Sequence, residues 1–162
     1  MPTNLAALPS NKPIPNGKIQ IKRGAEGSVD VANITPYGTK LSDGAGGFYE
    51  ISYTPTYACY WVVRANVMAH QATGNVWQRW DYRINITPAD ADGVTSGITC
   101  PTELHTSLSW RTFASNARFR LNPGVAYTAF LTHQYSTGDW HRYHTNGLYT
   151  RLIGRIVGEG TL

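Results

Sequence analysis

The stretch "VWQRWDYRINI" (residues 76–86) decides the fold class, because its apolar side chains recur at every second position. Apart from Gln78, its even positions are apolar: Val76, Trp80, Tyr82, Ile84 and Ile86. Its odd positions, with the exception of Trp77, carry charged or polar side chains. A period of two places one set of side chains on each face of an extended strand. The stretch therefore predicts a β-strand with one buried and one hydrated face.

The same period recurs along most of the chain. Residues 125–135 repeat the half-buried pattern, whereas residues 58–68 carry apolar side chains on both faces. Shorter strands are predicted at 18–22, 28–34, 48–53, 106–113, 117–121 and 148–157. Clusters of glycine, serine and aspartate at residues 42–47 and 90–93 predict turns, and no stretch offers ten residues of helical period with a cap. We therefore predict an all-β fold, specifically a two-sheet jelly-roll sandwich.

The first 17 residues, "MPTNLAALPSNKPIPNG", differ in composition from the rest. They contain four prolines, which impose extended geometry and remove backbone donors. This segment is either a flexible terminus or an extended arm that becomes ordered on a neighbouring subunit. In the second case Leu5, Leu8 and Ile14 would dock on that neighbour. We divide the chain into an extended proline-rich N-terminal arm (1–17) and a jelly-roll domain (18–162).

Length and charge limit the classes of partner. A chain of 162 residues is expected to form one domain with a substantial core. Only 15% of its residues are charged, which suggests that partners cover much of the surface. The net charge of +4 comes from scattered lysines and arginines, so we expect no specific nucleic-acid binding. Without a leader sequence or an apolar run of about 20 residues, we expect synthesis in a host cytoplasm and no membrane association.

Two local patterns resemble metal sites but predict other structures. Cys59 and Cys100 are isolated in the sequence, so we expect two buried thiols, with a single disulfide as the alternative. Asp90-x-Asp92-Gly93 opens like a calcium loop, yet the twelfth position holds Pro101 instead of glutamate, which predicts a turn. We expect no metal and no cofactor.

The segment "DWHRYHTNG" (139–147) concentrates aromatic side chains between turn residues. His141 and His144 have a metal-ligand spacing for a helix, but in a strand they would point to opposite faces. We predict a hairpin tip with hydrated aromatic side chains. A possible ligand surface on it comprises Trp140, His141, Tyr143 and His144, and metal binding is a further alternative.

Sequence motifs for catalysis are absent. The chain has no GxSxG, phosphate-binding loop, HExxH or dinucleotide-binding pattern. Carboxylate pairs for glycoside cleavage meet only in space, so a small hydrolase is the remaining alternative in this class. We predict that the protein is not an enzyme.

The C-terminal stretch "LYTRLIGRIV" (148–157) carries apolar side chains on both faces of its predicted strand. A monomer buries one face of such a strand, and the other leaves an apolar stripe that soluble monomers avoid. The second face is therefore predicted to pack against another subunit, unless the strand is central to a thick monomer core. Candidate interface residues from the doubly apolar strands are Tyr60, Val62, Tyr149, Ile153 and Val157.

Two segments resemble known jelly-roll proteins. "RFRLNPGVAYTAFLT" (118–132) resembles the penultimate hairpin of trimeric jelly rolls of the tumour-necrosis-factor and complement-globular-head type. "GGFYEISYTPTYACYWVVRANVM" (46–68) resembles versions of that fold in tailed-bacteriophage virion proteins, such as head decoration proteins and head fibres. The resemblance covers residues 46–157 and implies homotrimers with aromatic and aliphatic residues packed between subunits, and no catalysis.

Taken with this resemblance, the sequence leads us to expect a structural virion protein. It would form a homotrimer that decorates and stabilises a viral capsid, as a minor capsid protein bound to the major capsid protein or another virion protein. The alternative is a receptor- or carbohydrate-binding module of a phage fibre or tail.

Overall fold

The computed structural model describes residues 19–31, 35–71, 80–97, 110–135 and 141–158, and all regular structure in these ranges is β-strand. The strands are β1 (Ile19–Arg23), β2 (Ser28–Val31), β3 (Thr35–Lys40), β4 (Glu50–Tyr53), β5 (Cys59–Gln71), β6 (Trp80–Thr87), β7 (Arg111–Leu121), β8 (Tyr127–Tyr135), β9 (His141–His144) and β10 (Arg151–Gly158). Within these ranges there is no helix with the length and apolar character that a membrane span requires. The predicted all-β class is therefore confirmed.

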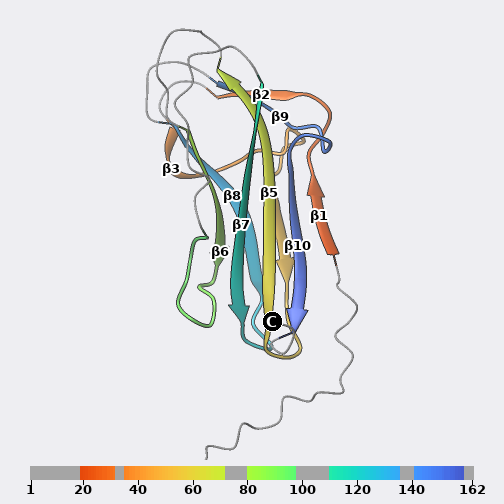
Figure 1. Ribbon diagram of the computed structural model, residues 1–162, viewed down its shortest axis with the longest axis vertical. Helices are drawn as coiled ribbons and strands as arrows, with labels where there is room; N and C mark the ends of the chain where they lie inside the picture. The colour runs from red at the N-terminus through yellow and green to blue at the C-terminus, as the bar shows by residue number, and fades with distance from the viewer. Residues whose placement is uncertain (1–18, 32–34, 72–79, 98–109, 136–140, 159–162) are drawn as a thin grey trace, which may run out of the picture.

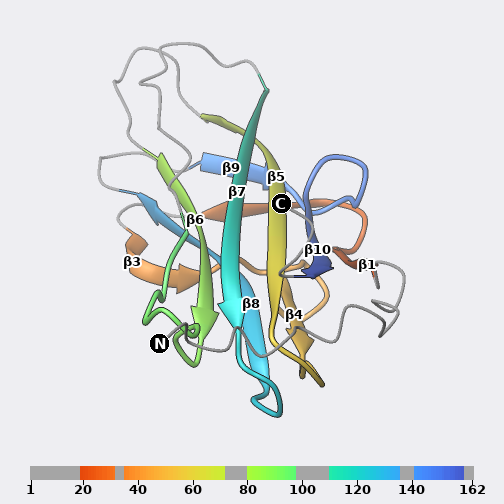
Figure 2. The same cartoon turned by 60° about the horizontal axis from the view of Figure 1, so that its bottom comes forward.

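The strands form two antiparallel sheets that pack as layers (Figures 1 and 2). The first sheet has the order β1-β10-β5-β9-β2, with β7 on the other edge of β5. The second has the order β3-β8-β4, with β6 on the other edge of β8. Each sheet therefore has one long central strand, β5 or β8, that organises its neighbours.

Strand β5 holds three partners because it is 13 residues long. Strand β7 pairs with it from Cys59 to Ala69, while β10 pairs along the opposite edge from Cys59 to Asn66. Strand β9 continues that opposite edge from Ala69 to Gln71. Strands β9 and β10 thus line one edge of β5 in succession.

The core lies between the sheets and is made by the inward-facing side chains that the two-residue period predicts. The predicted inner face of β5 is buried, and it comprises Cys59, Trp61, Val63, Ala65 and Val67. The described part of the predicted inner face of β6 is buried as well: Tyr82, Ile84 and Ile86. Tyr127, Ala129 and Leu131 of β8 complete the same layer. Cys100 lies outside the described residues, so the absence of a disulfide stays a prediction.

Gly154 makes room for the largest core side chain. It occupies an inward position of β10, where an added Cβ would lie 2.5 Å from Trp61 Nε1 and 2.6 Å from Ile51 Cδ1. Replacing Gly154 with alanine is therefore expected to destabilise the fold by about 1–3 kcal/mol through overpacking. Urea unfolding measures the loss, and Thr54→Ala at an exposed position is the control, expected to change stability by less than about 0.5 kcal/mol. Equal midpoints for the two variants would contradict this account of the core.

Several predicted strand boundaries require correction. The predicted strands 106–113 and 117–121 belong, where described, to the single strand β7. The predicted strand 148–157 begins only at Arg151, because Asn146 organises a turn before it. The Asn146 carbonyl accepts from the amides of Tyr149 and Thr150, and its side-chain oxygen accepts from the amide of Leu148.

Strand β3 was not predicted, and it contains Pro36 and Gly38, two residue types that disfavour a regular strand. The structure accommodates them with a register shift between Thr35 and Thr39, and Gly38 has a φ of 86° there. A bulge of this kind suits the left-handed backbone that glycine adopts without strain. The arm (1–17), with Leu5, Leu8 and Ile14, lies outside the described residues, so both interpretations of it stand.

Candidate oligomer interface and ligand surface

The outer face of the first sheet, opposite the core, is built from alternate residues of four adjacent strands. Cross-strand pairing aligns Ile21, Ile153, Arg64 and Asn116 in one row across β1, β10, β5 and β7. The next row in one direction holds Ile19, Arg155, Val62 and Arg118. The row in the other direction holds Arg23, Arg151, Asn66 and Ala114. We call this surface the β5 outer face.

Apolar side chains on the β5 outer face are left accessible in the monomer. Ile19 and Ile21 of the edge strand β1 are 59% and 48% exposed, although isoleucine is among the residues most often buried. Val62 and Ile153 beside them are half-buried. Exposed β-branched residues in adjacent strands form a contiguous patch of the kind that marks an interaction surface.

The same face is rich in arginine and carries no carboxylate. Its arginines are Arg23, Arg64, Arg118, Arg120, Arg151 and Arg155, and every outward position of β1, β5, β7 and β10 is described. The Arg118 guanidinium lies 3.7 Å from the centre of the Tyr60 ring, and Arg120 reaches Asp92 of a neighbouring loop at 3.5 Å. Arginine stems cover apolar surface while their charged ends stay hydrated, so this face is both apolar and strongly positive.

Four of the five predicted interface residues lie on this face. Tyr60, Val62, Ile153 and Val157 are half-buried outward residues of β5 and β10. Tyr149 lies in the turn before β10 and not in the predicted strand, and there it is 44% exposed with its ring 5.0 Å from that of His144. Ile19 and Ile21 were not among the predicted residues, because their place on this face depends on the pairing of β1 with β10. The interface itself stays a prediction.

The aromatic cluster near β9 is a strand surface and not a hairpin tip. His141–His144 form β9, which pairs with both β2 and β5. The ring of Trp110 stacks on His144 with centroids 3.8 Å apart and meets the edge of His70 at 4.2 Å. With Tyr149 against His144, four rings form a continuous ladder that joins β5, the residue before β7, the end of β9 and the turn before β10. We call this set, His70, Trp110, His144 and Tyr149, the aromatic ladder.

Only one predicted ligand residue is placed on that ladder. His144 belongs to it, but Tyr143 is 1% exposed, so its place on a ligand surface is corrected. Its position faces the core because it alternates with Arg142 and His144, and its hydroxyl donates to the Ser42 carbonyl at 3.0 Å. Trp140 and the His141 side chain lie outside the part of the chain that is described.

Burial within the core raises the pKa of the Tyr143 phenol above its usual range. The phenol therefore stays neutral and acts as a structural donor. Among the described residues, no group of three or more His, Cys, Asp or Glu side chains is placed to hold a metal.

An ion pair fixes the edge of the sheet beside the ladder. Arg142 of β9 makes a two-pronged contact with Asp30 of β2, in which Nη2 lies 2.9 Å from Oδ2 and Nε contacts Oδ1. The hydrogen bonds from Arg142 hold the pKa of Asp30 below its usual range. The pair is exposed, so it orients the two strands and contributes little stability.

The other acidic pattern is a turn, as predicted. Asp90 Oδ1 accepts from the backbone amides of Asp92 and Val94, and its Oδ2 accepts from the amide of Arg120. A carboxylate that already accepts three amide hydrogen bonds closes a loop and is poorly suited to calcium.

The chain is similar to known proteins in its fold. No family model matches the chain, and no curated protein matches it. Eiger TNF from S. frugiperda is 10% identical, with a TM-score of 0.58 over 91% of this chain and 96% of that one. The infectious bursal disease virus Gt strain structure is 13% identical, with a TM-score of 0.53 over 90% of this chain and 34% of that one. The chain has a jelly-roll fold.

A third similar structure is the VP2 subviral particle of infectious bursal disease virus. It is 10% identical, with a TM-score of 0.50 over 90% of this chain and 33% of that one. The chain therefore spans about a third of the length of these viral proteins. At such identities the likeness concerns the fold alone. The function depends on the surfaces that this chain presents on that fold, the β5 outer face and the aromatic ladder.

Proposed function

We propose that the chain is a structural virion protein that decorates and stabilises a viral capsid as a homotrimer. The observation that carries the proposal is the β5 outer face, where Ile19 and Ile21 are exposed beside Ile153 and Val62. Association through area and symmetry needs such a face and no reactive side chain. The jelly-roll folds of Eiger TNF and of the bursal disease virus proteins support the same class.

The virion assignment rests on two further observations. The fold likeness includes a viral particle protein, and the sequence of residues 46–68 resembles virion proteins of tailed bacteriophages. We propose the capsid as the partner, the virion as the location and a bacteriophage as the source. The arm (1–17) supplies the attachment to the major capsid protein or another virion protein.

The mass in solution tests the proposal directly. Light scattering at micromolar concentration is expected to give three times the 17.9 kDa of one chain. The mass of a single chain would contradict the trimer and leave the apolar face unexplained.

The aromatic ladder favours a second candidate function. Trp110, which stacks on His144 and meets His70 edge to face, is partly accessible, and aromatic side chains can stack on sugar rings. A receptor- or carbohydrate-binding module of a phage fibre or tail would use it.

Two variants assign attachment to the arm or to the ladder. Deleting residues 2–16 is expected to leave a folded trimer that no longer sediments with the capsid. Replacing Trp110 and His144 with serine is expected to leave co-sedimentation unchanged, because the ladder lies within the folded sheet and outside the arm. The reverse pattern, with a silent deletion and loss of binding in the serine variant, would place recognition at the ladder and favour the second function.

A further inference from the structure

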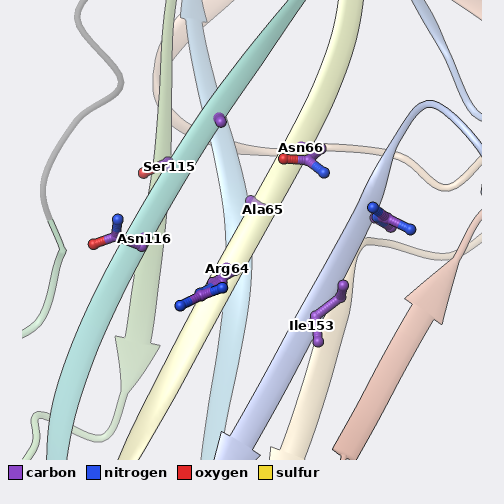
Figure 3. Close-up of a pocket in the computed structure, with 8 residues that line it drawn as sticks. Arg64, Ala65, Asn66, Ser115, Asn116 and Ile153 are labelled. Atoms are coloured by element: carbon purple, nitrogen blue, oxygen red, sulfur yellow. The ribbon is translucent and has the colours of Figure 1, made fainter.

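A depression of about 370 Å³ lies on the β5 outer face between β5, β7 and β10. It is lined by Arg64, Asn66, Asn116, Arg151, Ile153 and the small residues beside them (Figure 3). The hollow has a simple cause, because the short side chains of Ala114 and Asn66 are paired with each other, whereas Arg151, which pairs with Asn66 on its other side, is long. Rows of outward residues two positions apart are about 7 Å apart along a strand, which leaves space for a small ligand.

The polar groups of this depression are mostly donors. Arg64 and Arg151 contribute two guanidinium groups, and Asn66 and Asn116 contribute two carboxamides from the flanking positions. Within the described chain neither arginine forms an ion pair, and the Nε atom of Arg151 is buried without a hydrogen-bond acceptor. Burying a charged donor without an acceptor is unfavourable. A negatively charged ligand in the depression would supply the acceptor that Arg151 Nε does not have within the described chain.

Among the described carboxylates of a second copy, only that of the exposed Glu26 forms no ion pair or hydrogen bond within its own chain. Those of Asp30, Asp43, Glu50, Asp90 and Asp92 already contact basic side chains or accept amide hydrogen bonds within their own chain. The pKa of Asp43, for example, is lowered because its carboxylate accepts a hydrogen bond from Lys22. A free anion therefore fits the depression better than the described carboxylates that are already engaged in their own chain.

We propose that the depression formed by Arg64, Asn66, Asn116 and Arg151 binds a free oxyanion of the phosphate or sulfate type. Guanidinium groups bind such anions through two parallel charge-assisted hydrogen bonds, and the carboxamides add neutral donors. The site is independent of the proposed trimer. If the β5 outer face joins three copies, however, the anion neutralises arginines that would otherwise repel one another across the interface.

Titration with inorganic phosphate tests the site on the full-length protein. Heat of binding is measured calorimetrically at constant ionic strength, with chloride exchanged for phosphate, on whatever oligomer is present. Arg64→Gln and Arg151→Gln are each expected to weaken phosphate binding about tenfold or more, because each removes a charge-assisted pair. Arg155→Gln removes the same charge from the same face but not from the depression, and is expected to bind within about twofold of the unmodified protein.

The outcomes separate the site from the trimer. Phosphate binding that depends on Arg64 and Arg151, and not on Arg155, supports the site whether the protein is a trimer or a monomer. No measurable binding, or equal weakening in all three variants, would overturn it and indicate only a diffuse positive surface. Light scattering in chloride buffer, measured separately, decides the oligomeric state, so failure of one proposal is distinguishable from failure of the other.

Discussion

Replacing Ile153 with lysine is expected to convert the proposed trimer into monomers that keep their fold. Ile153 is half-buried in the monomer, between Ile21 of β1 and Arg64 of β5 in the pairing register. Its neighbours along β10 are Arg151 and Arg155, on the same face. A lysine there would add one more positive charge to an already positive interface, at a cost of about 4 kcal/mol, which weakens association roughly a thousandfold.

Lysine is a sharper choice than aspartate at this position. An aspartate would lie among Arg64, Arg151 and Arg155, where it could pair with a guanidinium and offset its own burial. Ile153→Asp is therefore expected to weaken the trimer less than Ile153→Lys, although both remove the same apolar side chain. Opposite charges at one position thus distinguish an electrostatic effect from a loss of packing.

Sedimentation velocity measures the change in mass, and thermal unfolding checks that the monomer is folded. Val94→Lys is the matched control, because Val94 is 40% exposed in the loop after β6 and is not one of the residues of the β5 outer face. That variant is expected to remain trimeric. A trimeric Ile153→Lys protein of unchanged stability would show that the interface lies on another face.

Acidification from pH 6.5 to 4 is expected to reduce the free energy of unfolding by about 3 kcal/mol. The group responsible is His133 of β8, which points into the core between the rings of Tyr82 and Tyr143. Burial lowers the pKa of His133 to about 4, compared with about 6.5 in an unfolded chain. The unfolded chain therefore binds a proton in this window that the folded chain does not bind.

The sign and the window follow from these two pKa values. Stability due to a neutral His133 is complete above about pH 6.5, falls as the pH decreases, and stops falling near pH 4. The carboxylates of Asp30 and Asp43 have lowered pKa values, so their contribution is lost only below the usual aspartate range. Among the described Asp and His side chains with a resolved pKa shift, His133 is therefore the one whose shift spans the interval between pH 4 and 6.5.

Urea unfolding at a series of pH values measures this dependence. In His133→Gln the slope between pH 4 and 6.5 should largely disappear, whatever the absolute stability of the variant. A glutamine variant with the slope of the unmodified protein would assign the pH dependence to other groups.

The two-residue period predicted the central strands and their inner faces, because β5, β6 and β8 are long enough to show several alternations of apolar and polar side chains. It failed at β9, whose four residues are too few to show a period and whose histidines suggested a hydrated loop. It also extended β10 too far, since Leu148 and Tyr149 continue the apolar pattern while the Asn146 side chain closes a turn. Short strands and turns are decided by single hydrogen bonds that the pattern does not contain.

The candidate surfaces were predicted less completely than the core. Each arginine of the β5 outer face appears in the sequence as one polar residue of a half-buried strand. Only the register of β1, β10, β5 and β7 brings six of them to one carboxylate-free face. The aromatic ladder has the same origin, because His70, Trp110 and His144 come from separate segments and meet through the pairing of β5 with β7 and β9.

The successive pairing of β10 and β9 along one edge of β5 has a consequence for biosynthesis. When residues 59–71 leave the ribosome, the backbone groups of that edge have no partner until residues 141–158 have been made. Pairings between segments so far apart close slowly, and an open edge beside an apolar face can pair with another nascent chain in the meantime. The availability of chaperones during this interval would therefore limit the yield of native protein. Slower synthesis would prolong the exposure of β5.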